Sequence, residues 1–221
     1  IRNKGKNKKQ GKWRLETSNH IESDKEKQEI LAVTRLFDDA HITRIDIAID
    51  YINFANAGMH YRFYKPNVKQ YWIKERNGTI GTIYCGSSGS TIQYRYYDKL
   101  KERNAKKARI PPNIKSWERL EVKLRGKNTL NWLVETKKAL VYFKCPDKVK
   151  LDNEKITTVA MLEYLINHPE RLNNKDLSKG TLAKYRKLLK QNKGLDNRLA
   201  LIAMNELDKQ AESLRQEINS F

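Results

Sequence analysis

The sequence predicts an α+β fold, in which a largely antiparallel central sheet is flanked by helices and followed by a helical C-terminal region. The centre of the chain contains several apolar and aromatic runs with a period of two, which is the pattern of strands. Asn77-Gly78 lies between two such runs and is a strong hairpin signal. Beyond Gly126 the apolar residues recur at helical spacing instead.

The N-terminal part predicts an arm, a short strand and a helix. Residues 1–12 are basic, rich in Gly and Asn and without periodicity, so we expect a flexible arm that is either a solvated tail or a DNA contact. The segment "WRLET" at 13–17 resembles a strand. A serine cap, early acids and an apolar stripe predict an amphipathic helix over 23–37.

The central strands follow one another with turn signals between them. Residues 42–54 alternate isoleucine with Asp and Ala, residues 70–86 form the predicted hairpin, and residues 86–100 begin with a Gly/Ser turn that leads into a strand. A basic, proline-containing loop is expected at 101–115, and another alternating strand at 116–126.

Four helices are predicted beyond this sheet, at 128–143, 155–168, 178–191 and 195–218. The chain is therefore divided into three parts: the basic arm at 1–12, a main α+β domain at 13–145 and a helical C-terminal region at 146–221.

The charge of the chain predicts a polyanionic partner. Its 45 Lys and Arg against 26 Asp and Glu give a net charge of +19, which favours nucleic acid, with an anionic membrane surface as the alternative. No apolar run reaches the length of about 18 residues that a membrane span needs, so we expect no membrane insertion. Cys85 and Cys145 have no partners at metal spacing, which favours a reducing cytoplasm.

Two acids share one face of the strand "RIDIAID". Asp46 and Asp50 are separated on that face only by the small Ala48, which leaves room for an ion or a substrate. A solvated acidic face is the alternative.

Glu121 is the lone acid on the basic face of the strand "SWERLEVKLR". It forms a salt bridge with Arg119 or Lys123, or it joins Asp46 and Asp50 around Mg²⁺ or Mn²⁺, which prefer carboxylate oxygens. The second possibility requires that the two strands be neighbours in the sheet.

Alternation also divides the tyrosines of "TIQYRYYDKLKE". Tyr97 shares its face with Arg95 and Lys99, whereas Tyr94 and Tyr96 point to the other face. Nearby cations favour a phenolate, so we predict that Tyr97 is a nucleophile at phosphorus. Alternating aromatic and basic residues would equally suit base stacking on single strands.

Three motifs in this order resemble the replication-initiation-factor family, namely "ITRIDIAID", "TIYCGSSGSTIQYRYYDK" and "SWERLEVKLR". That family comprises the Rep proteins of staphylococcal-type rolling-circle plasmids and related relaxases of integrative and conjugative elements. The resemblance covers about residues 40 to 130. It implies that the domain at 13–145 nicks and joins DNA at a plasmid origin, at an unpaired or hairpin site.

The family resemblance also implies roles for residues. Tyr97, within "YYDK", would form a 5′-phosphotyrosyl bond and free a 3′-OH. The family's metal-binding acids would match Asp46, Asp50 and Glu121, with Glu118 less favoured because it falls on the leucine face. The sequence has no His-hydrophobe-His motif, and His41 is either a further ligand or a surface histidine.

Further side chains, most of them basic, are predicted to bind the reacting phosphate or the DNA around it. Arg95, Lys99 and Lys123 would stabilise charge on the reacting phosphate. The helix at 178–191 is expected to contact a groove or the backbone, or to present a solvated charged face. The predicted DNA-binding residues are Arg119, Lys123, Arg125, Tyr96, Lys184, Arg186 and Lys187.

Two alternatives remain beside the plasmid initiator. A relaxase would use the same chemistry, but relaxases of this family often carry an added N-terminal DNA-binding module that the sequence does not show, so the initiator is preferred. A non-catalytic protein that binds single-stranded nucleic acid is the second alternative. The family resemblance also implies a homodimer and a host helicase as partner.

Overall fold

The computed structural model describes residues 2–3, 13–15, 23–38, 40–54, 57–146, 154–173, 177–191 and 195–219. They belong to two compact units, Ile1–His41 with Leu214–Phe221, and Ile42–Ser213. Apart from Arg2–Asn3, the predicted arm lies outside the described residues. No helix among the described residues is long and apolar enough to cross a membrane.

The first unit contains a short strand pair and a capped helix. Strand β1 (Arg2–Asn3) pairs with β2 (Trp13–Arg14). Only β2 lies within the segment at 13–17 that was predicted to be a strand. Helix α1 (Asp24–Thr34) begins with a capping box, in which the Ser23 hydroxyl accepts from the backbone of Glu26 and the Glu26 carboxylate accepts from the backbone of Ser23. The predicted helix is therefore confirmed, but it ends three residues earlier than residue 37.

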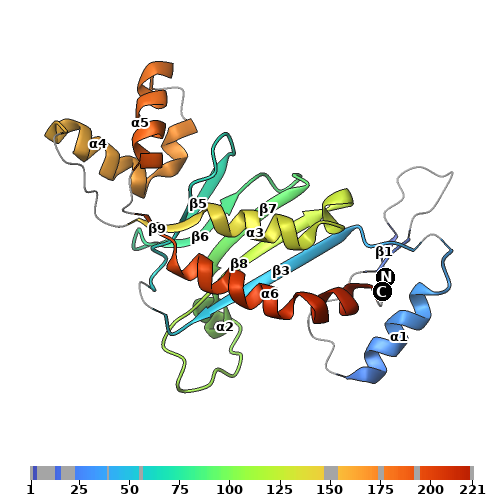
Figure 1. Ribbon diagram of the computed structural model, residues 1–221. Coiled ribbons are helices and arrows are strands. Elements are labelled where there is room, and N and C mark those ends of the chain that lie inside the picture. The colour runs from blue at the N-terminus through green and yellow to red at the C-terminus, as the bar shows by residue number, and fades with distance from the viewer. Residues whose placement is uncertain are drawn as a thin grey trace. The chain divides into compact units, whose positions relative to one another are not determined.

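A five-stranded antiparallel sheet dominates the second unit, in the order β3-β8-β7-β6-β5 (Figure 1). Together with the helices it confirms the predicted α+β class. The strands are β3 (Arg44–Ile52), β5 (Gln70–Lys74), β6 (Ile80–Cys85), β7 (Ile92–Asp98) and β8 (Trp117–Arg125).

The β5–β6 hairpin turns at Asn77-Gly78, as predicted. The backbone N–H of Glu75 donates to the Thr79 carbonyl at 2.8 Å, and the N–H of Gly78 donates to the Glu75 carbonyl at 2.9 Å. Gly78 has a φ of +82°, which a glycine adopts without steric cost.

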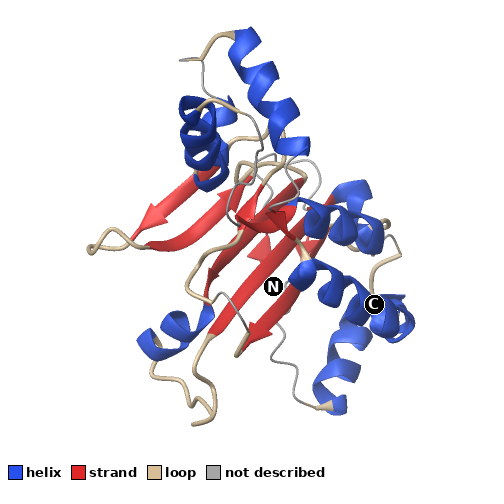
Figure 2. Ribbon diagram, turned by 60° about the vertical axis from the view of Figure 1, so that its left-hand side comes forward, coloured by secondary structure: helices blue, strands red, loops and turns tan. Residues whose placement is uncertain are grey.

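Helices lie on both sides of this sheet. Helix α3 (Trp132–Tyr142) and the second unit's part of α6 (Arg198–Asn219) lie on one side, and Lys137 of α3 forms an ion pair with Asp208 of α6 (Figure 2). Helix α2 (Lys99–Ala105) packs at one end of the other side, where the Arg103 guanidinium lies 5.9 Å from the centroid of the Trp117 ring system.

Helix α2 corrects the expectation of a loop at 101–115. The Asp98 side chain accepts from the backbone N–H of Lys101 at 2.9 Å and so caps the helix. The cap is the last residue of β7, so the sequence offers no separate signal for the helix start.

Aromatic side chains fill the core between the sheet and a second, three-stranded sheet. That sheet pairs β4 (Arg62–Phe63) and β10 (Leu195–Asp196) with β9 (Phe143–Pro146), and none of the three was expected as a strand. Phe143 is fully buried, and the centroid of its ring lies 5.0 Å from that of Tyr61 and 4.8 Å from that of Tyr96. Strands of two to four residues leave no periodicity to detect.

The predicted helices at 155–168 and 178–191 are present as α4 (Ile156–Asn167) and α5 (Lys179–Gln191). They share a small core of their own, formed by Leu162, Leu165, Ile166, Tyr185 and Leu189. A short 3₁₀ helix at Gly126–Thr129 follows β8, and another at Pro169–Asn173 follows α4.

Buried Arg62 links this helical pair to the small sheet. It donates to the backbone carbonyls of Tyr61 at 2.8 Å and of Asn167, at the end of α4, at 3.4 Å. That residues 146–221 form a helical region that binds DNA or extends the structure stays a prediction.

Candidate active site

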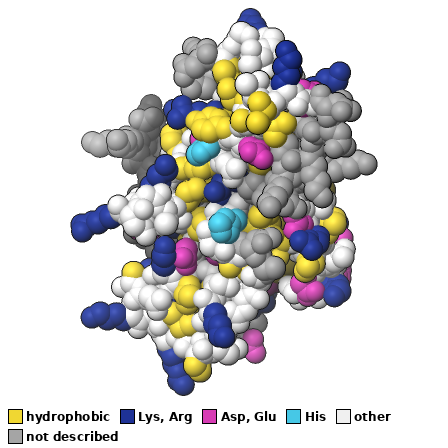
Figure 3. All heavy atoms as spheres, turned by 90° about the vertical axis from the view of Figure 1, so that its left-hand side faces the viewer, with side chains coloured by type: hydrophobic (Ala, Val, Ile, Leu, Met, Phe, Trp, Pro, Cys, Tyr) yellow, Lys and Arg dark blue, Asp and Glu magenta, His cyan; other side chains and the backbone are white. Residues whose placement is uncertain are grey.

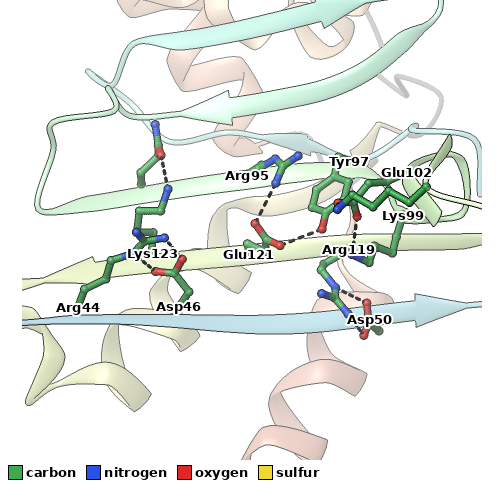
Figure 4. Close-up of polar contacts among 12 residues, drawn as sticks. Arg44, Asp46, Asp50, Arg95, Tyr97, Lys99, Glu102, Arg119, Glu121 and Lys123 are labelled. Carbon is green, nitrogen blue, oxygen red and sulfur yellow. Dashed lines mark hydrogen bonds and ion pairs between the residues drawn. The ribbon is translucent and has the colours of Figure 1, made fainter. Parts of the chain in front are cut away.

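One face of the five-stranded sheet carries the residues predicted to act on a phosphate. Strand β8 lies between β3 and β7, so the condition that the two acidic strands be neighbours is met. Residues paired across the strands form rows on this polar face (Figure 4). The two central rows are Ala48–Glu121–Arg95 and Asp50–Arg119–Tyr97.

The phenol of Tyr97 lies against Glu121. Tyr97 Oη donates a hydrogen bond of 2.9 Å to Glu121 Oε1, and Arg95 Nη1 donates one of 3.3 Å to Glu121 Oε2 (Figure 4). The Arg95 guanidinium carbon also lies 3.9 Å from the centroid of the Tyr97 ring. Glu121 therefore connects a phenol and a guanidinium of β7 through its two oxygens.

The environment of Tyr97 disfavours its phenolate. Burial raises the pKa of Tyr97 above its ordinary value of 10.0, and the hydrogen bond to Glu121 raises this pKa further. The expectation that neighbouring cations would ionise the phenol therefore does not match the structure, because Arg95 faces the ring and the Glu121 carboxylate. The phenol keeps its proton at neutral pH, and Glu121 is placed to accept it.

Lys99 forms its main contact with Glu102, within the first turn of α2. Its ammonium forms an ion pair with Glu102 and lies 5.7 Å from the centroid of the Tyr97 ring. Lys106 donates to the other oxygen of Glu102 at 2.6 Å. Burial opposes ionisation of Glu102, but the hydrogen bonds from the two lysines lower its pKa to about 2. The charge of Lys99 is thus shared with a carboxylate beside the phenol.

Asp46, Asp50 and Glu121 lie on one face, but they do not surround one point. Asp46 forms an ion pair with Arg44, and Asp50 accepts two hydrogen bonds of 2.7 Å from Arg119. The described part of the chain holds no group of three or more His, Cys, Asp or Glu that could bind a metal.

Strand geometry explains why one ion does not fit all three acids. Asp46 and Asp50 are four residues apart in β3, which places their Cα atoms about 13 Å apart. Bonds of about 2.1 Å to Mg²⁺ leave a gap that two aspartate side chains are too short to bridge. The residues therefore do not fit the predicted three-acid site. His41, the other candidate ligand, likewise belongs to no group of three potential ligands among the described residues.

Tyr96 and Glu118 lie on the core face, where alternation places them. Tyr96 is fully buried and donates its hydroxyl proton to Glu118. Glu118 Oε1 accepts from the backbone N–H groups of Gly58 at 2.5 Å and Met59 at 2.9 Å. The prediction that Tyr96 contacts DNA is therefore wrong, because its ring and hydroxyl are both used inside the protein.

The predicted DNA contacts on β8 have partners within the protein. Lys123 donates to the Gln93 side chain at 3.3 Å, and Arg125 donates to the carbonyls of Ser88 at 2.5 Å and Ser90 at 3.1 Å. Arg119, paired with Asp50, sits directly opposite Tyr97. Arg119 therefore borders Tyr97, whereas Lys123 and Arg125 lie farther along the sheet and fix the strands and the turn before β7.

Of the predicted DNA contacts on α5, two lie against other groups of the protein and one is exposed. Arg186 donates to the Leu172 carbonyl at 2.7 Å and holds the turn that precedes the helix, whereas Lys184 lies 3.4 Å from the Thr158 hydroxyl. Lys187 and Lys190 are exposed, and α5 contains no acidic residue. Elsewhere on the surface, Lys and Arg side chains project around the face seen in Figure 3, with exposed hydrophobic side chains between them.

Three aromatic residues of the polar face were not predicted as part of the site. Trp117 Nε1 donates to Asp50 at 2.7 Å, beside the bonds from Arg119. Tyr84 pairs with Arg95, and Tyr71 pairs with Tyr84, so both tyrosines extend the row of Glu121 toward the edge of the sheet. Period-two alternation carried through the predicted hairpin would have placed them there.

No protein-family model and no curated protein sequence matches the chain. Among solved structures, a rolling-circle replication initiator protein from Geobacillus stearothermophilus is similar to it, with a TM-score of 0.33 and 17% sequence identity. The similarity covers 61% of this chain and 60% of that one. A functional assignment therefore rests on the residues of the polar face.

Proposed function

We propose that the protein nicks and rejoins one DNA strand at an origin, with Tyr97 as nucleophile, and so initiates rolling-circle replication of a plasmid. The observation that carries this proposal is the 2.9 Å hydrogen bond from the Tyr97 phenol to Glu121, whose other oxygen binds Arg95. The sequence motif supports the same tyrosine independently of this contact.

The reaction requires one displacement at phosphorus and two proton transfers, one from the phenol and one to the leaving oxygen. Glu121 takes the phenolic proton as Tyr97 Oη forms a bond to phosphorus, while the bond from phosphorus to the 3′-oxygen breaks. The departing 3′-oxygen takes a proton from water, and the 5′-phosphate stays on Tyr97. The phosphotyrosyl bond retains the energy of the diester, so the reverse reaction rejoins the strand without ATP.

Arg95 is suited to stabilise the charge that develops on the phosphate. Its guanidinium lies against both the Tyr97 ring and Glu121, and its Nε is buried without a hydrogen-bond partner. Donors held in place before the reaction stabilise such charge most effectively. No step is assigned to the Mg²⁺ or Mn²⁺ that the family resemblance implies, because Asp46, Asp50 and Glu121 do not fit one ion, and the assay supplies both ions in solution.

The substrate would be an unpaired strand, since the phosphodiester must reach the phenol of Tyr97, a residue that is only 3% exposed and lies on the face of a sheet. A hairpin extruded at an origin would supply such a strand. The net charge of +19 supplies affinity that does not depend on sequence and that falls steeply with salt.

Covalent capture tests this proposal. We would incubate the protein with a pool of single-stranded oligonucleotides that carry hairpins with randomised loops, with Mg²⁺ or Mn²⁺, and identify nucleotide-bearing peptides by mass spectrometry. The expected result is an adduct on Tyr97 that Tyr97→Phe abolishes. Tyr164→Phe, which changes an exposed tyrosine on α4, is the matched control.

Two outcomes would overturn the proposal. Nucleotide on Tyr96 instead of Tyr97 would mean that the wrong tyrosine has been assigned. Tight binding of the strands without any adduct would favour the non-catalytic binding protein, in which Tyr97 only supports the aromatic surface.

A further inference from the structure

An aromatic row continues the Tyr97 site across β6 and β5, the last two strands at one edge of the sheet. Tyr84 of β6 lies opposite Arg95, and Tyr71 of β5 lies opposite Tyr84. Side chains paired in this way stand about 5 Å apart on the same face of a sheet. The row therefore runs from Glu121 through Arg95 to two tyrosines at the sheet's edge.

Both tyrosines of this row are flanked by cations, and Tyr71 is exposed whereas Tyr84 is half-buried. Tyr71 is 42% exposed, and the Lys69 ammonium lies 4.9 Å from its ring centroid. The Arg95 guanidinium lies 5.8 Å from the centroid of the Tyr84 ring. Ile73, the next residue on this face of β5, is 55% exposed. Tyr71 and Ile73 are neighbours on this face and adjoin Tyr84, and a contiguous exposed apolar surface of this kind is typical of a binding site.

We propose that Tyr84 and Tyr71 form a stacking track for the unpaired DNA strand next to the scissile phosphate. This inference rests on the proposed function and names where the strand runs, which is from Tyr97 across β6 and β5. Aromatic rings beside cations suit a strand with exposed bases and charged phosphates, because every base has a face to stack and every phosphate needs a counter-charge. The track is expected to be indifferent to sequence, since stacking does not read base edges.

Binding measurements with two probes of equal charge test the track. One probe is an oligothymidylate of about 12 nucleotides, and the other is an abasic strand of the same length. Tyr71→Ala and Tyr84→Ala are each expected to weaken binding of the oligothymidylate about 5- to 150-fold and to leave binding of the abasic strand unchanged. Tyr71→Phe and Tyr84→Phe should keep the affinity, because the ring is retained.

Controls separate stacking from other causes. Tyr164→Ala removes a tyrosine of similar exposure, 46%, from α4 and should not change either affinity. An equal loss on both probes would indicate a structural or purely electrostatic effect and would overturn the inference, as would no loss on either. A base-dependent loss in a protein that never forms a covalent adduct would support the track and refute the nicking function, so the two proposals fail separately.

Discussion

Tyr97 and Glu121 meet diagonally across β7 and β8. The register places Tyr97 opposite Arg119 and places Glu121 opposite Arg95, yet Tyr97 Oη lies 2.9 Å from Glu121 Oε1. Diagonal neighbours on one face have Cα atoms about 7 to 8 Å apart, a distance that two long side chains can bridge. The contact thus depends on the length of both side chains as well as on the register.

Replacing Glu121 tests its role as general base. Glu121→Gln keeps the side-chain length but cannot take a proton at neutral pH, so single-turnover adduct formation is expected to fall about 10²- to 10⁴-fold. DNA affinity, measured on the same protein, should change little. A rate within tenfold of the unsubstituted protein would argue that Glu121 only positions the phenol.

The raised pKa of Tyr97 predicts a particular pH profile. Because the phenol stays protonated throughout, no rise in rate from its ionisation is expected between about pH 7 and 10. In Glu121→Gln the base is missing, so the rate should instead increase with hydroxide over this interval. A plateau that begins near the ordinary tyrosine pKa in the unsubstituted protein would favour a preformed phenolate.

Asp46 provides a contrast to Glu121. It forms an ion pair with Arg44 at the surface and is separated from Asp50 by about 13 Å, so Asp46→Asn should leave adduct formation in Mg²⁺ or Mn²⁺ within about twofold. The measurement compares adduct yields of Asp46→Asn and Glu121→Gln side by side. Equal losses in both variants would restore the idea of a shared ion site.

Glu118 is expected to matter for stability rather than for the reaction. Glu118→Gln replaces the oxygen that accepts the hydroxyl proton of buried Tyr96 with an amide NH₂ group, and should lower the free energy of unfolding by about 1 to 3 kcal/mol. Chemical denaturation of both proteins would measure this loss.

The effect of Glu118→Gln should depend on pH. Burial raises the pKa of Glu118 above its ordinary value of 4.5. A group with a raised pKa contributes its stability fully below the unfolded pKa and loses it as the pH rises through the folded pKa. The difference between the two proteins should therefore be largest below about pH 4.5 and shrink at higher pH. A difference that grows with pH would contradict this account.

Much of the polar face follows from the sequence because a strand has a strict period of two. Alternation alone puts Tyr97 with Arg95 and turns Glu118 to the core, and the structure shows both arrangements. The spacing of Asp46 and Asp50 likewise implies their separation, which the three-acid hypothesis did not take into account.

The partner of each side chain does not follow from the sequence. Whether Glu121 meets Arg119, Lys123 or a phenol depends on which strands are neighbours and in which register, and these are long-range facts. The strands around Phe143 were missed for a related reason, since segments of two to four residues gain their stability from packing and carry no pattern.

Strand β7 contains two interleaved sets of residues. Tyr94 and Tyr96 are buried and fill the core, while Arg95 and Tyr97 lie on the polar face, where both bind Glu121 and face the proposed substrate. Selection should therefore act on neighbouring residues by different criteria, ring volume at one position and charge or acidity at the next. Natural variation along this strand is expected to alternate accordingly, and adjacent tyrosines in the chain would diverge independently.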